Sequence, residues 1–344
     1  LVFPVYFPIP PRFFCMLFTS PLSLSIISPH SPTSLSMDLS SVNLLAAGAL
    51  AVPIGAYALV QLARLAVPGP HRQARFNFKD KTVLITGAST GLGAALAREL
   101  YTRGARLILV ARSIDKLKTL CESIKESGAG HEPVYAYLDL AEPEKVDELV
   151  KLSHDGKIDC LVNNAGISMR GSILETDMSV QRKVMETNYF GQVAVTRALL
   201  PFIPSDGAIV VTSSMQGKMA LPYRSAYGAS KHAVQAFFDS LRAEERFGLH
   251  ILVVSAGYIA TELGNNALDA SGRPTGVTDG NVGNGLKPEE AARQIADATE
   301  RRKPELLMAP LLHRFTVFLR YWWPSLYFYS VWKRHIMQEG KKKE

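Results

Sequence analysis

The chain has little cysteine and no signal for N-linked glycosylation. Its 344 residues include three cysteines, Cys15, Cys121 and Cys160, too few for a disulfide framework. The sequence Asn-x-Ser/Thr does not occur, so there is no acceptor for N-linked sugars. Both absences argue against a small disulfide-stabilised secreted fold, and they favour a domain that folds on the cytosolic side of a membrane.

Charge is missing from two stretches near the N-terminus. Residues 1–36 are rich in Pro, Ser and Phe and carry only Arg12 as a charged residue. They lack the basic start and the small-residue cleavage site of a signal peptide, so we expect leader or untranslated-region sequence before a start at Met37. Residues 42–63 carry no charge at all. As a helix they would be about 33 Å long, enough to cross a hydrocarbon core of ~30 Å.

We therefore predict an N-terminal transmembrane helix over residues 42–63, with a buried soluble helix as the alternative. Asp38 precedes this segment, while Arg64 and Arg72 follow it. The positive-inside rule then places the rest of the chain in the cytosol. The C-terminal Lys341-Lys342-Lys343-Glu344 resembles the dilysine retrieval signal of endoplasmic reticulum membrane proteins, and a basic tail without an addressing role is the alternative. We expect the endoplasmic reticulum membrane as the location, with the peroxisomal membrane as the alternative.

A glycine-rich turn between a strand and a helix indicates a phosphate site. Val83–Thr86 is a short apolar, β-branched run typical of a buried strand. It leads into Gly87-Ala88-Ser89-Thr90-Gly91-Leu92-Gly93, and residues 94–100 are typical of a helix. Glycines let the backbone approach a pyrophosphate, and a helix N-terminus presents free N–H groups to it. An ordinary tight βα loop is the alternative interpretation.

Tyr227 and Lys231 lie four residues apart, a spacing that puts both side chains on one face of a helix. A phenol is a poor acid at neutral pH, with an unperturbed pKa of about 10. An ammonium beside it lowers that pKa and makes proton donation to a substrate oxygen feasible. The same spacing is common on surface helices, so the interpretation depends on the other motifs.

Taken together, the motifs resemble the classical short-chain dehydrogenase/reductase family over about residues 80–308. Asn163-Asn164-Ala165-Gly166 matches the family segment that closes the fourth strand, and Asn188 matches its helix asparagine. Ser214 precedes Tyr227 by thirteen residues, the family's usual separation for its catalytic serine. The resemblance implies an α/β fold with a single doubly wound Rossmann-type parallel sheet.

The resemblance also implies catalytic roles. Tyr227 would be the general acid in reduction and the base in the reverse direction. Lys231 would lower the pKa of Tyr227 and hold the nicotinamide ribose. Ser214 would stabilise charge on the substrate oxygen, and Asn188 would hold a water in a proton relay. Ser213 is the rival for the serine role, and only the thirteen-residue spacing selects Ser214.

The predicted cofactor is NADP(H). Arg112 follows the second strand, where an NAD enzyme usually carries a carboxylate for the ribose 2′-hydroxyl. A guanidinium pairs well with a 2′-phosphate, although a solvated arginine at a strand end is the alternative. By resemblance, Asp139 contacts the adenine. The predicted cofactor contacts are Gly87, Ser89, Thr90, Gly91, Leu92, Gly93, Arg112, Ser113, Asp139, Leu140, Asn164, Ala165, Gly166, Tyr227, Lys231 and Thr261, and no metal site is expected.

Two loops are singled out by the comparison with the family pattern. The family commonly has Pro-Gly after the sixth strand, where this chain has Ala256-Gly257, which predicts a less rigid turn. Residues 264–285 are rich in glycine and polar residues, and in this family the region forms the substrate lid. We expect a mobile lid. A disordered surface loop is the alternative.

The C-terminal tail carries all of the net charge. Residues 301–344 hold ten Lys/Arg against three Asp/Glu, a net of +7 that equals the charge of the whole chain. Aromatic side chains are mixed with these cations, which favours a lipid headgroup interface over nucleic acid. A tail that packs on the core is the alternative. The predicted organisation is a leader over 1–36, an anchor over 42–63, a linker over 64–79, the catalytic domain over 80–308 and the tail over 309–344.

These features predict a membrane-anchored, NADP(H)-dependent oxidoreductase that acts on a carbonyl or alcohol of a lipophilic substrate. Parts of the chain resemble a membrane-anchored subgroup linked to lipid metabolism, which implies acyl- or alkyl-dihydroxyacetone phosphate as a candidate beside steroids and retinoids. Family resemblance also favours a homo-oligomer. The alternatives are an NADP(H)-binding regulatory or scaffold protein without turnover, and a sugar-nucleotide epimerase.

Overall fold

The structure is a computed structural model that describes residues 51, 54–60, 62–63, 73–128, 130–143, 146–244, 248–277, 283 and 285–343, with side chains up to residue 337. The chain divides into two compact units, Leu1–Arg64 and Leu65–Glu344. In the first, residues 54–60 are helical and exposed. No helix within the described ranges is both long and apolar enough to cross a bilayer. More than half of the predicted anchor, and all of the predicted leader, lie outside those ranges.

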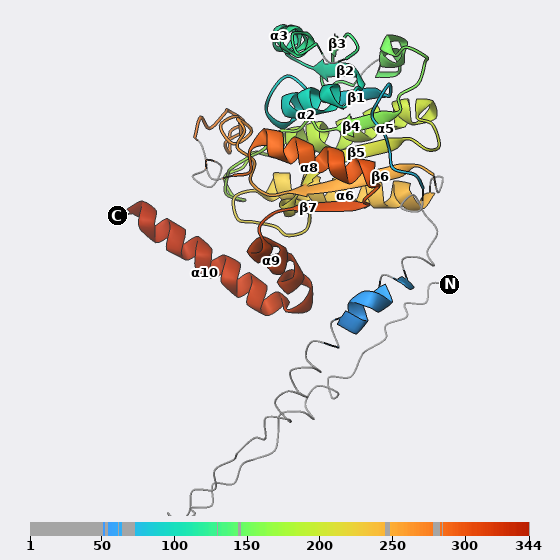
Figure 1. The fold of residues 1–344 in the computed structure, drawn as a ribbon. Helices are drawn as coiled ribbons and strands as arrows, with labels where there is room; N and C mark the ends of the chain where they lie inside the picture. Colours follow the sequence, from blue (N-terminus) through green and yellow to red (C-terminus); the bar gives the residue numbers. More distant parts are fainter. Residues whose placement is uncertain are drawn as a thin grey trace, which may run out of the picture. The chain divides into compact units, whose positions relative to one another are not determined.

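The second unit is built on a seven-stranded sheet in which every neighbouring pair is parallel (Figure 1). The strand order is β3-β2-β1-β4-β5-β6-β7. The order reverses between β1 and β4, and such a switch point opens a crevice at the carboxyl ends of the strands. The predicted doubly wound α/β fold is confirmed. The strands are β1 (Thr82–Thr86), β2 (Arg106–Ala111), β3 (Val134–Tyr137), β4 (Cys160–Asn163), β5 (Ala208–Ser214), β6 (His250–Ala256) and β7 (Glu305–Met308).

Helices cover both faces of the sheet, which explains the near-continuous apolar strands. Within β1, Val83 and Ile85 pack into one core cluster and Leu84 into the other. The first cluster lies under α2, α3 and α8, and the second lies under α5 and α6. The helices of this unit are α2 (Gly91–Thr102), α3 (Ile114–Lys125), α4 (Met178–Met185), α5 (Gly191–Leu199), α6 (Ser225–Glu244), α8 (Pro288–Glu300), α9 (Leu311–Trp322) and α10 (Pro324–Lys343). Short helical turns are Val146–Leu152, Glu186–Phe190, Leu200–Phe202 and Met215–Gly217.

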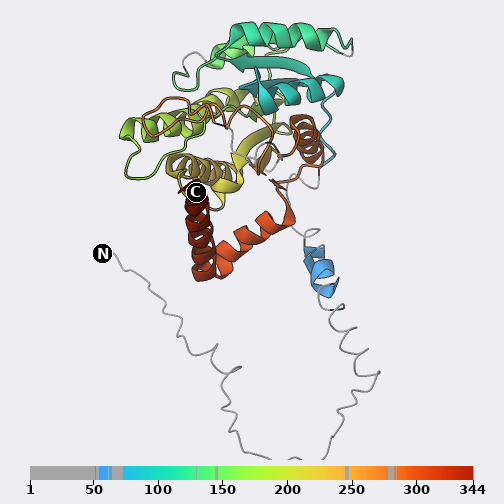
Figure 2. The ribbon, with the colours of Figure 1, turned by 90° about the vertical axis from the view of Figure 1, so that its left-hand side faces the viewer.

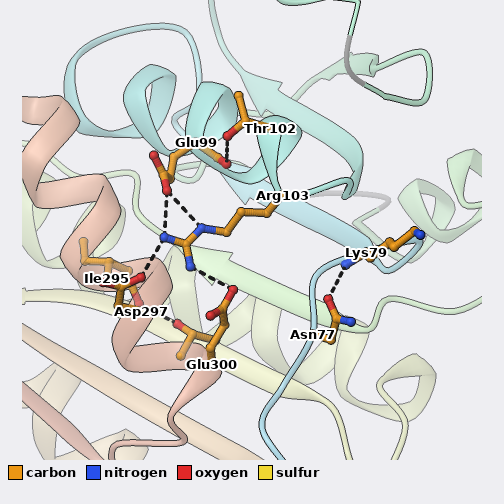
Figure 3. Close-up of polar contacts among 9 residues, drawn as sticks. Asn77, Lys79, Glu99, Thr102, Arg103, Ile295, Asp297 and Glu300 are labelled. Carbon is orange, nitrogen blue, oxygen red and sulfur yellow. Dashed lines mark hydrogen bonds and ion pairs between the residues drawn. The ribbon is translucent and has the colours of Figure 1, made fainter.

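Arg103, just after α2, ties that helix to α8 (Figure 3). Its guanidinium lies 2.7 Å from Glu99 and from Asp297, and 2.8 Å from Glu300. Glu99 belongs to α2, whereas Asp297 and Glu300 belong to α8. One planar, multivalent cation therefore holds together α2 and α8, two of the helices on this face of the sheet.

After β7 the chain forms a V-shaped hairpin of α9 and α10 (Figures 1 and 2). Tyr327 on α10 is 2% exposed, and its hydroxyl donates a 2.8 Å hydrogen bond to the carbonyl oxygen of Ala220. The described part of the predicted tail is thus mostly helical, and Tyr327 fastens it to the loop that contains Ala220.

Candidate active site

The glycine-rich turn between β1 and α2 is shaped for close approach to a ligand. Gly87 and Gly91 have φ of 64° and 56°, a left-handed backbone that favours glycine. A Cβ at Gly93 would collide with the carbonyl oxygen of Gly87 and lie 2.7 Å from Nδ2 of Asn164. Thr90, at the start of α2, makes no side-chain capping bond. The first N–H groups of α2 therefore face the turn, an arrangement that fits a pyrophosphate.

The end of β4 is fastened to the end of β1 by a pair of side chains. The hydroxyl oxygen of Thr86 accepts from the N–H groups of Asn164 at 3.0 Å and Ala165 at 3.1 Å. Nδ2 of Asn164 donates to the carbonyl oxygen of Thr86 at 3.0 Å. These bonds bring the two predicted cofactor segments, residues 87–93 and 164–166, to the same edge of the sheet.

Ser214, Tyr227 and Lys231 converge from two elements. Ser214 ends β5, and α6 carries Tyr227 and Lys231 one turn apart. Tyr227 hydrogen-bonds to Ser214, whose oxygen also accepts from the N–H of Gln216 at 3.1 Å. Nζ of Lys231 lies 5.8 Å from the centroid of the Tyr227 ring. These three of the four catalytic candidates line one cleft, whereas the fourth, Asn188, is not among the residues of its wall.

Burial is the largest cause of the pKa shifts of Tyr227 and Lys231. The pKa of Tyr227 is raised, mainly by burial, while the hydrogen bond with Ser214 and the charge of Arg224 oppose the rise. Burial lowers the pKa of Lys231 to about 8. Lys231 was expected to lower the pKa of Tyr227, but its ammonium lies over the phenol ring and bonds to the carbonyl oxygen of Thr212 at 2.8 Å. In this geometry burial outweighs that effect.

Asn188 is fully buried at a single π-helical turn, Glu186–Phe190. Its Oδ1 accepts from the N–H of Ile167 at 2.8 Å, and its Nδ2 donates to the carbonyl oxygen of Ile167 at 2.9 Å and to the hydroxyl of Ser230 at 3.0 Å. A Cβ at Gly166 would lie 3.1 Å from Oδ1 of Asn188 and 3.6 Å from Nζ of Lys231. Asn188 therefore clamps the loop after β4 to α6, and its role in a water relay stays a prediction.

Cationic side chains line the end of the cleft beyond β2, where the sequence predicts the adenosine half of the cofactor. Arg112 follows β2 with its side chain 62% exposed, and its Nη1 lies 4.0 Å from Oδ2 of Asp139. Ser113 and Leu140 line the cleft beside them. Lys116, four residues after Arg112 and in the first turn of α3, also lines it. The sequence prediction missed Lys116; its place in the first turn of the helix that follows the predicted cofactor residues Arg112 and Ser113 was the signal that could have found it.

One cleft of about 1970 Å³ contains almost the whole predicted site. This volume exceeds the ~300–1,000 Å³ of a typical ligand pocket, so a dinucleotide and a second ligand fit together. A Cβ at Gly91 would lie 3.2 Å from the side chain of Thr261, which closes the glycine turn from across the cleft. The predicted cofactor residues in its wall are Gly87, Ser89, Thr90, Gly91, Leu92, Gly93, Arg112, Ser113, Asp139, Leu140, Asn164, Ala165, Gly166, Tyr227, Lys231 and Thr261.

The two unusual loops are held by hydrogen bonds. At Ala256-Gly257, the N–H of Gly257 donates to the carbonyl oxygen of Met308 at 2.9 Å, so β7 holds the turn that lacks the family proline. In the predicted lid, the N–H of Leu268 donates to Ser168 at 2.9 Å, and Leu268 accepts from Arg170 at 2.7 Å. The described part, residues 264–277, is fastened to the loop after β4. Residues 278–282 and 284 lie outside the described ranges.

Comparisons with known proteins identify the family of the chain. The short chain dehydrogenase family model matches residues 81–271. Dehydrogenase/reductase SDR family member 7B of Xenopus tropicalis is 44% identical over 85% of this chain and 95% of the relative. The same member of Bos taurus is 43% identical over 73% and 80%.

Solved structures share the fold and hold related cofactors. L-sorbose reductase from Gluconobacter frateurii, complexed with NADPH and L-sorbose, has a TM-score of 0.58 and 26% identity over 68% of this chain and 97% of that one. An alcohol dehydrogenase from Thermococcus sibiricus, complexed with 5-hydroxy-NADP, has a TM-score of 0.56 and 26% identity over 67% and 95%. This chain belongs to the short-chain dehydrogenase/reductase family of oxidoreductases, and it is similar to member 7B over most of its length.

Proposed function

We propose that the chain is an NADP(H)-dependent reductase of a carbonyl group on a lipophilic substrate. The observation that carries the proposal is the convergence of Ser214, Tyr227 and Lys231 with the glycine-rich turn in one cleft. When bound, the nicotinamide supplies a hydride to the carbonyl carbon. The protein would supply a proton, a hydrogen bond to the reacting oxygen and a fixed geometry.

Tyr227 is protonated at neutral pH, because burial raises its pKa, and this is the state that a proton donor needs in reduction. The same rise makes the phenol a weaker acid, so the hydrogen bond with Ser214 and the charge of Arg224, which oppose the rise, would aid proton transfer. Ser214, in hydrogen-bond contact with Tyr227, would donate to the substrate oxygen as negative charge develops there. In the oxidative direction the same phenol would first have to lose its proton, which burial opposes.

The cations at the adenosine end support NADP(H) over NAD(H). Arg112 is an exposed guanidinium, with Lys116 beside it in the cleft wall. A 2′-phosphate would gain two charge-assisted contacts there, whereas a 2′-hydroxyl would gain far less. The L-sorbose reductase and alcohol dehydrogenase structures, both complexed with NADP-type cofactors, support the same choice.

The membrane features are part of the proposal. The uncharged segment 42–63 and the cations after it support an anchor with the catalytic domain in the cytosol, at the endoplasmic reticulum or the peroxisomal membrane. An anchored site favours substrates that reside in the bilayer. Candidates are acyl- or alkyl-dihydroxyacetone phosphates, steroids and retinoids, acted on by a homo-oligomer.

The test is NADPH oxidation by the full-length protein in lipid, measured against that substrate panel, with Tyr227→Phe as the control. We expect turnover of one class, reduced at least about 10²-fold in the variant while NADPH affinity is kept. NADPH binding without turnover of any substrate would instead favour the regulatory alternative.

A further inference from the structure

The α9–α10 hairpin has an inner face that belongs to the substrate side of the cleft. Besides the bond from Tyr327 to Ala220, the hydroxyl of Thr316 contacts the sulfur of Met219 at 3.4 Å. The rings of His335 and Tyr223 lie 5.3 Å apart. These contacts fall on residues 219–223, between Ser214 and Tyr227 in the chain. The hairpin residues in the cleft wall include Thr316, Leu319, Tyr327 and Val331.

The opposite side of the hairpin is apolar and exposed, and we call it the outer face. On α9, Phe315, Phe318 and Trp322 follow helical spacing and stack in sequence, with ring centroids 6.1 Å and 5.4 Å apart. Trp322 is 76% exposed and Phe318 is 51% exposed. On α10 the outer face continues through Phe328, Tyr329, Trp332 and Ile336. Exposed aromatic rows of this size mark an interaction surface.

The charged side chains of the hairpin up to residue 337 are all basic, and Glu339 near the end of α10 is its first acidic residue. Residues 311–337 contain Arg314, Arg320, Lys333 and Arg334 but no Asp or Glu. The guanidinium of Arg320 lies 4.9 Å from the centroid of the Phe328 ring, so a cation borders the aromatic surface directly. Mixed aromatic and basic side chains on a helix suit the headgroup boundary of an anionic bilayer. A two-fold interface with a second copy would bring these cations together without an acidic partner from residues 311–337.

We infer that the outer face of the α9–α10 hairpin docks on an anionic lipid bilayer, as a membrane contact distinct from the N-terminal segment. The inner face of the same hairpin forms a wall of the cleft, so docking holds the mouth of the cleft at headgroup level. A further consequence, which rests on the proposed function, is that a lipophilic substrate reaches Tyr227 along the hairpin directly from the membrane.

The chain contains the probes for this experiment, because its three tryptophans, Trp322, Trp323 and Trp332, all lie in the hairpin. The full-length protein is reconstituted into phosphatidylcholine–phosphatidylserine vesicles with and without acyl chains brominated near the headgroup. We expect the brominated chains to lower tryptophan emission by about twofold or more, and high salt to weaken the effect. Emission unchanged by bromine in protein that sediments with the vesicles would overturn the inference. A blue-shifted but unquenched emission would assign the outer face to a second copy and would also overturn it.

Phe318→Glu places a carboxylate in the middle of the outer face and should remove most of the quenching. Leu174→Glu, at an apolar side chain that is 97% exposed outside the hairpin, is the matched control and should keep it. Thermal midpoints and NADPH affinity show whether each variant is folded. Turnover of a water-soluble carbonyl compound separates the proposal of membrane docking from the proposal of reductase activity, because such a substrate does not need the membrane. For Phe318→Glu we expect the quenching to be lost and this turnover to be retained. Quenching by wild-type protein that turns nothing over would contradict only the reductase proposal.

Discussion

Lys231 donates a 2.8 Å hydrogen bond from Nζ to the carbonyl oxygen of Thr212, two residues before Ser214 on β5. The bond joins α6 to β5 and fixes the ammonium beneath the site where Ser214 and Tyr227 meet. It satisfies only one of the three donors of an ammonium. Burial therefore dominates, and it lowers the pKa of Lys231 to about 8.

This pKa predicts how the Lys231 contribution to stability changes with pH. Below about pH 8 both the native and the unfolded chain hold the proton, so the native state carries the full cost of a buried charge. From there to about pH 10.5 the native state releases the proton first, so the free energy of unfolding rises with pH. The total gain is about 3 kcal/mol, at about 1.4 kcal/mol for each tenfold change in proton affinity.

The measurement is urea unfolding of wild type and Lys231→Met at pH 7 and pH 10. The difference between the two proteins isolates this lysine from other titrating groups. We expect Lys231→Met to be the more stable protein at pH 7, and its advantage to shrink by pH 10. An advantage that does not change with pH would show that Lys231 keeps an ordinary pKa.

Ser214→Ala should lower kcat by about 10²–10³-fold, because it removes a hydrogen-bond donor from the reacting oxygen. The matched control is Ser213→Ala, since Ser213 bonds instead to the carbonyl oxygen of Lys231 at 3.4 Å and to Gln235 at 3.2 Å. Steady-state kinetics with NADPH compare the two. A larger loss in Ser213→Ala than in Ser214→Ala would mean that the thirteen-residue spacing chose the wrong serine.

Arg112→Ala should raise the KM for NADPH by about 10–100-fold and leave the KM for NADH nearly unchanged, because only NADPH carries the 2′-phosphate. Lys116→Ala should have a smaller effect in the same direction. Lys118→Ala is the control, because Lys118 is an exposed lysine of α3, the helix that also contains Lys116. If both cofactors lost affinity equally, the 2′-phosphate would not be the group that Arg112 binds.

Gly93→Ala should destabilise the fold by about 1–3 kcal/mol, because the new methyl group collides with the carbonyl oxygen of Gly87. NADPH affinity should fall as well, since this turn is the proposed pyrophosphate site. Gly228→Ala is the control: it lies within α6, where a Cβ would have its nearest neighbour at 3.8 Å. That change should stabilise by about 0.5–1 kcal/mol. Thermal unfolding and NADPH titration measure both, and a Gly93→Ala protein with wild-type values would refute the packing argument.

Arg103→Met should cost about 1–3 kcal/mol of unfolding free energy, because it leaves Glu99, Asp297 and Glu300 close together without their shared cation. The effect should diminish in high salt. Lys125→Met removes an exposed pair with Glu132 and should change stability much less than Arg103→Met does, because solvent screens that pair. Denaturant unfolding midpoints of the two variants measure these changes. Equal losses of stability in Arg103→Met and Lys125→Met would indicate that the burial of the Arg103 network does not strengthen it.

Local patterns predicted the parts of the site that depend on neighbours in the chain. The apolar run Val83–Thr86 followed by glycines identified the strand, the turn and the helix, because each of these follows from backbone preferences over a few residues. The i, i+4 spacing placed Tyr227 and Lys231 on one helical face, and both line the cleft. Periodicity of this kind needs no knowledge of what packs against the segment.

Packing between distant segments decided the rest. The sequence could not show that Lys231 turns to Thr212, that Asn188 clamps Ile167, or that the described part of the predicted lid is bonded to the loop after β4. Nor could it separate the inner from the outer face of the α9–α10 hairpin. Chain spacing alone determined which side chains share a face. Burial, pKa and the partner of each polar group were decided by tertiary structure, because they depend on atoms that the chain supplies from tens to hundreds of residues away.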